Sequence, residues 1–305
     1  MLLDSASLYF RGFYGVPDTV RASDGTPVNA VRGFLDIIAK LVTDYGPESL
    51  VACWDDDWRP RWRVDLIPSY KAHRVERATG AGAVDVEVTP DALDRQVPVI
   101  REVLAALKIA VVGAEHYEAD DVIGTLSATA NGPVDIVTGD RDLFQLVDDA
   151  SQVRVLYTAR GVGQLEILDD ASIVSKYGVL PEQYVDFAVM RGDTSDGLPG
   201  VAGIGEKTAA SLLQRYGDLA SILTAVDDPT SGLSVGTRSK LRGAADYLAV
   251  APTVVAVARD IALPPLHARL SPLDATARDA AERLAEQYGL GGSMTRAVEA
   301  LAATG

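Results

Sequence analysis

The first 170 residues alternate short apolar runs with longer stretches of helical periodicity, and this alternation constrains the fold more than any other feature. Four apolar runs are predicted to form strands, at residues 2–4, 49–55, 109–113 and 134–140. Helical patterns follow them, and a β-hairpin is expected from residues 153–157 and 166–168. Strands that alternate with helices form parallel sheets with crossover connections. The sequence therefore predicts an α/β fold with a mostly parallel central sheet and flanking helices.

From about residue 169 the pattern becomes mainly helical, which predicts a second region. The expected organisation is an α/β core at 1–168, a helical region at 169–252 and a C-terminal segment at 253–305. In that last segment, residues 253–261 (TVVAVARDI) are predicted to form a strand that returns to the core, followed by C-terminal helices. Within the core, residues 77–90 contain glycine and little periodicity, so they are expected to form a loop.

Composition narrows the class of protein. Apolar residues make up 48% and charged residues 23% of the 305 residues, which is typical of a globular protein. The single cysteine, Cys53, excludes a disulfide framework and a cysteine-rich zinc site. No apolar run is long enough to span a membrane, so we expect a cytoplasmic protein without a membrane partner. The net charge of −15 argues against nucleic acid as a ligand unless basic groups are concentrated locally.

Carboxylates gather where the predicted strands end. Open α/β sheets bind ligands at the carboxyl ends of their strands, so these side chains are expected to converge. An oxygen-only set of mutually repelling acids favours hard divalent ions, Mg²⁺ or Mn²⁺, and two such ions suit phosphodiester hydrolysis. Each acid alone is equally explained as a helix cap, but the recurrence at strand after strand favours a metal site. The nine candidates are Asp4, Asp55, Glu118, Asp120, Asp121, Asp140, Asp142, Asp193 and Asp196.

Two local segments of the sequence have the groups that bind a polyanion. Residues 58–77 carry six basic side chains against two acidic ones, with tryptophan and tyrosine interleaved, which suits phosphates and splayed bases. The run at 199–217 (PGVAGIGEKTAASLLQRYG) predicts a helix–hairpin–helix that presents backbone N–H groups to a phosphate. The alternatives are a solvated loop and a glycine turn between packed helices; no strand leads into the glycines, which excludes a dinucleotide site. The predicted DNA-binding residues are Gly200, Gly203, Gly205, Lys207 and Thr208.

Together these segments resemble the bacterial 5′ nuclease family, which includes flap endonucleases and the N-terminal 5′–3′ exonuclease domain of DNA polymerase I. The matching segments run in family order from residue 2 to residue 217: LLDSASLYFRGFYG, WDDDWRPRWRVDLIPSYKAHR, YEADDVIGTL, VTGDRDLFQLV and MRGDTSDGLPGVAGIGEKTAASLLQRYG. The resemblance implies metal-site roles for all nine acids. Asp4, Asp55, Glu118 and Asp120 match the catalytic-side ion, and Asp140, Asp142 and Asp196, with Asp120, match the second. Arg11, Tyr70, Lys71 and Arg74 match residues that engage the scissile phosphate and the 5′ strand.

The resemblance also implies the rest of the architecture and the activity. Residues 72–98 correspond to a helical arch or clamp, and the hairpin corresponds to an element that holds downstream duplex, with a K⁺ ion as a further candidate. The implied function is a structure-specific, metal-dependent 5′ nuclease of replication and repair that acts, as a monomer, on DNA with a 5′ flap, nick, gap or 5′ end and on RNA primers. Ser5 and Gly197 depart from the usual family pattern, as does the short, glycine-containing arch. A junction-binding protein without catalysis and a metal-dependent phosphatase or RNase remain as alternatives.

Overall fold

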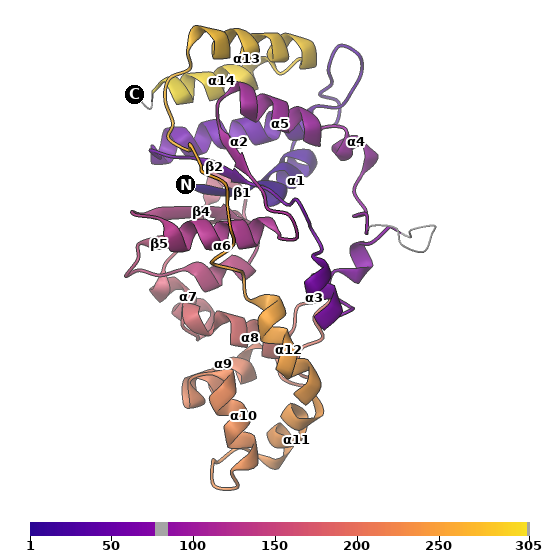
Figure 1. The fold of residues 1–305 in the computed structure, drawn as a ribbon, viewed down its shortest axis with the longest axis vertical. Helices are drawn as coiled ribbons and strands as arrows, with labels where there is room; N and C mark the ends of the chain where they lie inside the picture. The colour runs from indigo at the N-terminus through magenta and orange to yellow at the C-terminus, as the bar shows by residue number, and fades with distance from the viewer. Residues whose placement is uncertain (77–84, 304–305) are drawn as a thin grey trace.

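The computed structural model describes residues 1–76 and 85–303, and its centre is a six-stranded sheet (Figure 1). The strand order is β3-β2-β1-β4-β5-β6, and every neighbouring pair is parallel except β5 with β6. The predicted α/β class, the mostly parallel sheet and the edge hairpin are thereby confirmed. The strands are β1 (Leu2–Asp4), β2 (Val51–Cys53), β3 (Ala110–Val112), β4 (Val134–Thr138), β5 (Val153–Tyr157) and β6 (Glu166–Leu168).

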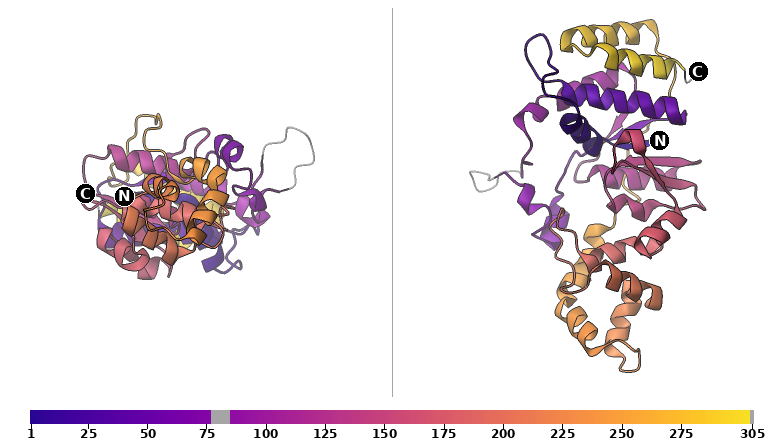
Figure 2. Two further views of the ribbon diagram at one scale, coloured as in Figure 1. Left: turned by 90° about the horizontal axis from the view of Figure 1, so that it is seen from below. Right: turned by 180° about the vertical axis from the view of Figure 1, so that it is seen from behind.

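Both faces of the sheet are buried. Because successive strand residues point to opposite sides, each strand contributes to two hydrophobic clusters. In β1, Leu2 packs in one cluster with Val122, whereas Leu3 packs in a second cluster with Phe34. The second cluster lies under five helices: α1 (Ser5–Gly15), α2 (Asn29–Tyr45), α5 (Val97–Ala106), α13 (Ala275–Tyr288) and α14 (Gly291–Ala302). Seen from behind, α1 and α2 in indigo lie between the sheet and the yellow C-terminal helices (Figure 2). The other face is covered by α6 (Ala119–Thr129) and the 3₁₀ helix η2 (Asp142–Leu146).

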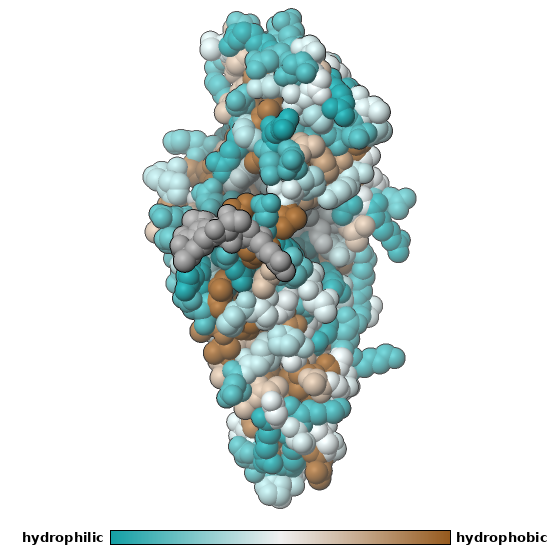
Figure 3. Space-filling model, turned by 90° about the vertical axis from the view of Figure 1, so that its right-hand side faces the viewer, coloured by the Kyte–Doolittle hydropathy of each residue, from teal (hydrophilic) through white to brown (hydrophobic). Residues whose placement is uncertain are grey.

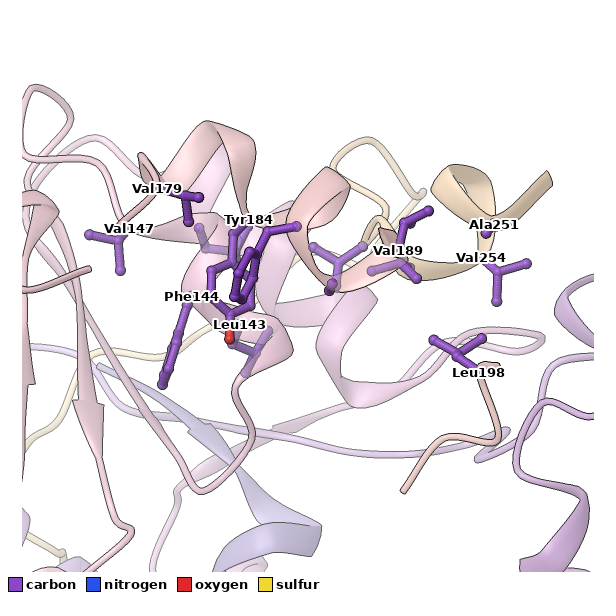
Figure 4. Close-up of a cluster of buried hydrophobic side chains, with 14 of the residues drawn as sticks. Leu143, Phe144, Val147, Val179, Tyr184, Val189, Leu198, Ala251 and Val254 are labelled. Carbon is purple, nitrogen blue, oxygen red and sulfur yellow. The ribbon is translucent and has the colours of Figure 1, made fainter. Parts of the chain in front are cut away.

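The helical region packs directly against η2. Phe144 and Leu143 of η2 contact Tyr184 and neighbouring buried side chains, and the cluster continues to Val254 (Figure 4). Because this core is continuous, the helical region has a fixed position relative to the sheet. Its helices are α7 (Asp170–Tyr177), η4 (Pro181–Gln183), α8 (Tyr184–Arg191), α9 (Glu206–Tyr216), α10 (Leu219–Asp227), α11 (Val235–Gly243) and α12 (Ala245–Val255).

The strand predicted at residues 253–261 is wrong. Helix α12 continues to Val255, and the residues after it make no sheet ladder. Side chains satisfy the backbone there instead: Gln145 donates to the Val255 carbonyl and accepts from the Val257 N–H, and Asp121 accepts from the Ala258 N–H. The first three residues of the predicted strand are therefore helical, and side-chain hydrogen bonds hold the residues that follow them, which periodicity does not reveal. The chain then runs along the sheet to α13 (Figure 1) and forms an isolated β-bridge between Ser49 and Arg269.

The arch expected at residues 72–98 contains only short helices in its described part. These are η1 (Ala72–Arg74) and α4 (Asp91–Asp94), besides the first turn of α5; residues 77–84, with most of the predicted loop, lie outside the described residues. A single bridge between Val75 and Glu87 joins the two sides. Two further short helices are α3 (Arg61–Leu66) and η3 (Val162–Gln164). In the described residues, no helix is long and apolar enough to cross a bilayer.

Candidate metal and nucleic-acid site

The carboxyl ends of the parallel strands open into a cleft of about 920 Å³. Strand β1 is central, with β2 and β3 on one side and β4 on the other, so the cleft lies at the topological switch point of the sheet. Five of the nine predicted acids line it together: Asp4, Asp55, Glu118, Asp120 and Asp140. The predicted convergence of strand-end acids is therefore present for these five residues.

Two more acids lie immediately behind this group. Asp142 at the start of η2 and Asp196 line a small cavity that they share with Glu118 and Asp120. Asp142 interacts electrostatically with both Asp140 and Asp196, which connects the two cavities. Seven predicted acids thus form one continuous acidic cluster.

Several acids of the cluster hold their protons more tightly than usual, because they are removed from water and lie beside other acids. Burial raises the pKa of Asp4 to about 7, the nearby Asp55 and Asp140 charges add to this, and a 2.6 Å hydrogen bond from Thr138 opposes it. Burial and the neighbouring acids also raise the pKa of Asp120 well above its ordinary value. A cation in the cleft would remove this cost.

The donor chemistry of the cluster fits a hard divalent ion, since every candidate ligand is a carboxylate oxygen. Burial raises the pKa values of Asp55 and Asp142, and that of Asp196 to about 6, as expected of acids without enough positive charge. Across residues 1–76 and 85–303, no three Asp, Glu, His or Cys side chains already surround one point as metal ligands do. The charge and the oxygen donors of these carboxylates nevertheless fit a divalent ion.

Glu118 is the acid that faces the cationic side of the cleft. Its Oε1 accepts from Lys71, and its Oε2 accepts from Arg63 and, at 2.7 Å, from the Tyr70 hydroxyl. Burial would raise the pKa of Glu118, but Lys71 and Arg63 outweigh it and hold this pKa below its usual value. The same pairing raises the pKa of Lys71 despite burial, so its ammonium stays charged. Lys71 is thus in the cleft, as predicted.

The structure does not place Tyr70 for contact with a substrate strand. Its side chain is buried, with 5% of the residue exposed, and it does not line the cleft. The aromatic side chains in the cleft are Phe10 and Tyr14 of α1 and Trp58. Phe10 and Tyr14 were missed, although their i, i+4 spacing on one helix face beside Arg11 was a usable signal.

Asp121 is turned away from the cleft and is fully paired. Its two oxygens accept from Arg63 at 2.7 and 2.8 Å, from the Glu118 N–H at 3.1 Å and from the Ala258 N–H at 2.8 Å. It is completely buried, so no oxygen is left to face an ion. The structure therefore does not bring Asp121 together with the cleft acids, because Arg63, 58 residues away in the sequence, donates to both of its oxygens.

Asp193 is also held by local partners. Its Oδ1 accepts from the Ser195 N–H and hydroxyl, and its Oδ2 accepts from Arg191 at 3.1 Å. Burial opposes ionisation, but the bonds from Ser195 and the charge of Arg191 outweigh it and lower the pKa of Asp193. Its charge reaches Asp142, so Asp193 borders the cluster without lining either cavity.

Two arginines face the acids across the cleft. Arg74 donates to the Ser195 carbonyl at 2.8 Å and to Asp196 at 3.1 Å. Arg11 lines the cleft, and its Nε is buried without a hydrogen-bond partner in the described part of the chain. An unpaired buried donor is costly, so this guanidinium is suited to accept an anion.

The glycine hairpin exposes Gly203 and Gly205, as predicted, but Gly200 is buried against the backbone of Arg191 and Gly192. Gly200 and Gly203 adopt φ values of +65° and +77°, which favour glycine, and Gly205 is the N-cap of α9. Lys207 and Thr208 are exposed in the first turn of that helix. The Lys240 ammonium of α11 donates to the Gly203 carbonyl at 2.9 Å, which places one more positive charge at the hairpin.

The side of the molecule that carries α3 and α4 is largely hydrophilic, with apolar side chains exposed around its mid-height (Figure 3). Val86 and Val88, on the described flank of the arch segment, are 55% and 61% exposed. Val88 also lines the cleft, beside Glu87 and His73, neither of which was predicted. Charged groups and exposed apolar groups therefore meet at the entrance to the acidic cluster.

Comparisons with known proteins agree with this geometry. Residues 1–178 match the family model of the 5'-3' exonuclease N-terminal resolvase-like domain, and residues 179–279 match that of the 5'-3' exonuclease C-terminal SAM fold. A 5'-3' exonuclease of Streptomyces coelicolor is 61% identical over 305 residues, covering 99% of this chain and 100% of that protein. One of Mycobacterium tuberculosis is 47% identical over 309 residues, covering 99% and 97%.

A solved structure of bacteriophage T5 D15 flap endonuclease, in a pseudo-enzyme–product complex with DNA and metal ions, has a similar fold. The TM-score is 0.63 at 15% sequence identity, and the match covers 99% of this chain and 98% of that one. At this identity the similarity concerns the fold.

Proposed function

The chain belongs to the 5'-3' exonuclease family, as its sequence predicted, and we propose that it is a divalent-metal-dependent 5′ nuclease. It hydrolyses DNA phosphodiesters close to the junction between a 5′ single strand and duplex. The observation that carries this proposal is the convergence of seven acids at the switch point of the sheet, faced across one cleft by cationic side chains.

The family resemblance implies two groups of acids, and the positions of the seven allow both. Asp4, Asp55, Glu118, Asp120 and Asp140 line the main cleft, and Asp142 and Asp196 line the small cavity together with Glu118 and Asp120. We propose these seven as the residues that hold Mg²⁺ or Mn²⁺, with Asp121 and Asp193 in supporting roles. When bound, such ions supply an activated water and stabilise the departing oxygen.

The cationic residues bind and orient the phosphate. Lys71 is a buried point charge whose position is set by Glu118, and Arg74 offers a planar fork at the edge of Asp196. Arg11 has donor capacity that no described residue uses. We propose that these three side chains neutralise charge on the scissile phosphate, while Tyr70 orients Glu118 rather than touching the strand.

The hairpin binds the duplex part of the substrate. Its exposed N–H groups, Lys207 and Thr208 meet the phosphate backbone without reading sequence. We retain a K⁺ ion at the hairpin as a proposal, with Lys240 already on the Gly203 carbonyl. The expected substrates are DNA with a 5′ flap, nick, gap or 5′ end and RNA primers, and the enzyme is proposed to act as a cytoplasmic monomer.

The test is incubation with 5′-labelled flap, nicked and single-stranded DNA in Mg²⁺, Mn²⁺ or EDTA, beside the variant Asp120→Asn. We expect metal-dependent cutting at the junction that Asp120→Asn abolishes while binding persists. Junction binding without cutting would mean a binding protein. Preference for a small phosphate ester over flap DNA would mean a phosphatase.

A further inference from the structure

Arg63 of α3 is a buried arginine with an unusually complete set of partners. It is 2% exposed, and its guanidinium donates to two acids and two backbone carbonyls. Nη1 donates to Glu118 and Asp121, Nη2 donates to Asp121 at 2.7 Å, and Nε donates to the Val254 carbonyl at 3.0 Å. A longer contact of 3.5 Å reaches the Ala256 carbonyl. The planar fork of arginine is needed to reach all these acceptors at once.

The partners of Arg63 lie in two places that are far apart in the sequence. One is Glu118, at the cleft; the other is the segment 254–258, where helix α12 ends. Asp121 makes the same connection on its own, because it accepts from the N–H groups of Glu118 and Ala258. Arg63 and Asp121 therefore each connect Glu118, at the cleft, to the end of α12 through hydrogen bonds.

Helix α12 belongs to the region that carries the hairpin. Its Tyr247 hydroxyl donates to the Val189 carbonyl of α8 at 3.0 Å, and α8 leads into the loop before the hairpin. Val201, inside the hairpin, donates in turn to the Met190 carbonyl of α8. A duplex bound at the hairpin is thus connected through α8, α12 and Arg63 to Glu118, which in turn holds Lys71.

We propose that Arg63 is a positioning residue that couples duplex binding at the hairpin to the placement of Glu118 and Lys71 in the cleft. This inference rests on the proposed nuclease function. The coupling requires that the guanidinium hold Glu118 and the end of α12 in one arrangement. Arg63 itself does not line the main cleft, where the scissile phosphate is proposed to bind, and borders the small cavity behind it.

The critical variant is Arg63→Lys. Lysine keeps the positive charge that Asp121 needs in its buried position, but its single ammonium cannot span Asp121, Glu118 and the Val254 carbonyl together. The matched control is Arg296→Lys in α14: Arg296 is exposed, pairs with Asp36 at 2.7 Å and lines neither cavity. If Arg63→Lys does not fold, Arg63→Gln, which retains an amide donor, is measured in the same way.

Each protein is assayed at saturating concentration, under single-turnover conditions with Mg²⁺, on two flap substrates. One has a downstream duplex long enough to reach the hairpin, and the other has a duplex too short to reach it. The rate ratio between the two substrates does not depend on the fraction of protein that is folded. DNA binding in EDTA and thermal unfolding are measured alongside.

We expect the wild type and Arg296→Lys to cleave the long-duplex substrate about tenfold faster than the short one, within the usual range of coupling between sites. For Arg63→Lys the ratio should fall to near one, while the dissociation constant of the long substrate in EDTA stays within about twofold of the wild type, since no binding group is lost. An unchanged ratio with a lowered melting temperature would make Arg63 merely structural and overturn the inference. Failure of the wild type to cut either substrate would instead overturn the proposed function.

Discussion

Replacing Gly197 by alanine tests how the acidic cluster is joined to the segment that carries Lys71. Gly197 has φ of +70°, and a Cβ built on it would lie 2.1 Å from the Ser69 carbonyl oxygen. Beside it, the Lys71 N–H donates to the Asp196 carbonyl at 2.9 Å. Gly197, which departs from the usual family pattern, therefore lets two backbones approach closely.

The cost of Gly197→Ala follows from these contacts. The left-handed conformation costs an alanine about 1–2 kcal/mol. Loss of the hydrogen bond from Lys71 to Asp196 adds about 1 kcal/mol. The less flexible unfolded chain of alanine returns about 0.4–1 kcal/mol. The net destabilisation is about 2 kcal/mol before any cost of the backbone clash, and at a few degrees per kcal/mol this lowers the melting temperature by about 4–8 °C.

The assay compares thermal unfolding and single-turnover cleavage of flap DNA for Gly197→Ala and for Gly163→Ala. Gly163 is a fair control because a Cβ built there meets nothing within 4 Å and its φ is not in the left-handed region. We expect the control to match the wild type and Gly197→Ala to lose stability and at least about tenfold in rate, because 1.4 kcal/mol of transition-state stabilisation corresponds to tenfold. A stable Gly197→Ala protein with full activity would refute the reasoning that this close approach positions Lys71.

Three further outcomes are expected. Burial raises the pKa of Asp4 to about 7 and that of Asp196 to about 6. Without metal, the folded protein therefore binds more protons than the unfolded chain from about pH 4 to about pH 7, and its stability falls as pH rises through that window. Thermal unfolding in EDTA should give a lower melting temperature at about pH 8 than at about pH 5, and an opposite trend would contradict the acidic cluster. Lys71→Met should slow cleavage by about 10²–10³-fold with little change in DNA binding, measured by single-turnover kinetics and anisotropy. Lys207→Ala should weaken duplex binding and lower the slope of log affinity against log salt by about one, measured by titration at several salt concentrations.

The sequence predicted the architecture of the site well because that architecture depends on local patterns. Asp4 ends β1, Asp55 and Asp140 each lie two residues after a strand, and parallel strands bring their carboxyl ends to one edge whatever the details of packing. The hairpin glycines were recognisable for the same reason, because a positive φ is a local backbone requirement. Predictions that needed only neighbours in the sequence were confirmed as structure.

The features that the sequence did not reveal depend on pairs of side chains distant along the chain. Asp121 stands next to Asp120 in one motif, yet Asp120 lines the cleft and Asp121 is turned toward Arg63. On a helix, adjacent residues point about 100° apart, so both cannot face one ion. The segment 253–261 was misassigned for a related reason: Arg63, Asp121 and Gln145 satisfy its backbone, and no local pattern encodes partners more than a hundred residues away.

Net charge was the least useful guide to the ligand, because it sums charged groups over the whole chain, whereas a bound substrate contacts only some of them. The charge of −15 includes the seven acids that converge on the cleft, which we propose hold metal ions rather than repel DNA. The cations that we propose for the phosphates are few and local: Arg11, Lys71 and Arg74 at the cleft, and Lys207 with Lys240 at the hairpin. Since exposed charges beyond about 10 Å are screened at moderate salt, binding is governed by these local groups. An acidic protein with this arrangement therefore binds a polyanion through two separated cationic positions, and the span between them is what Arg63 and α12 hold fixed.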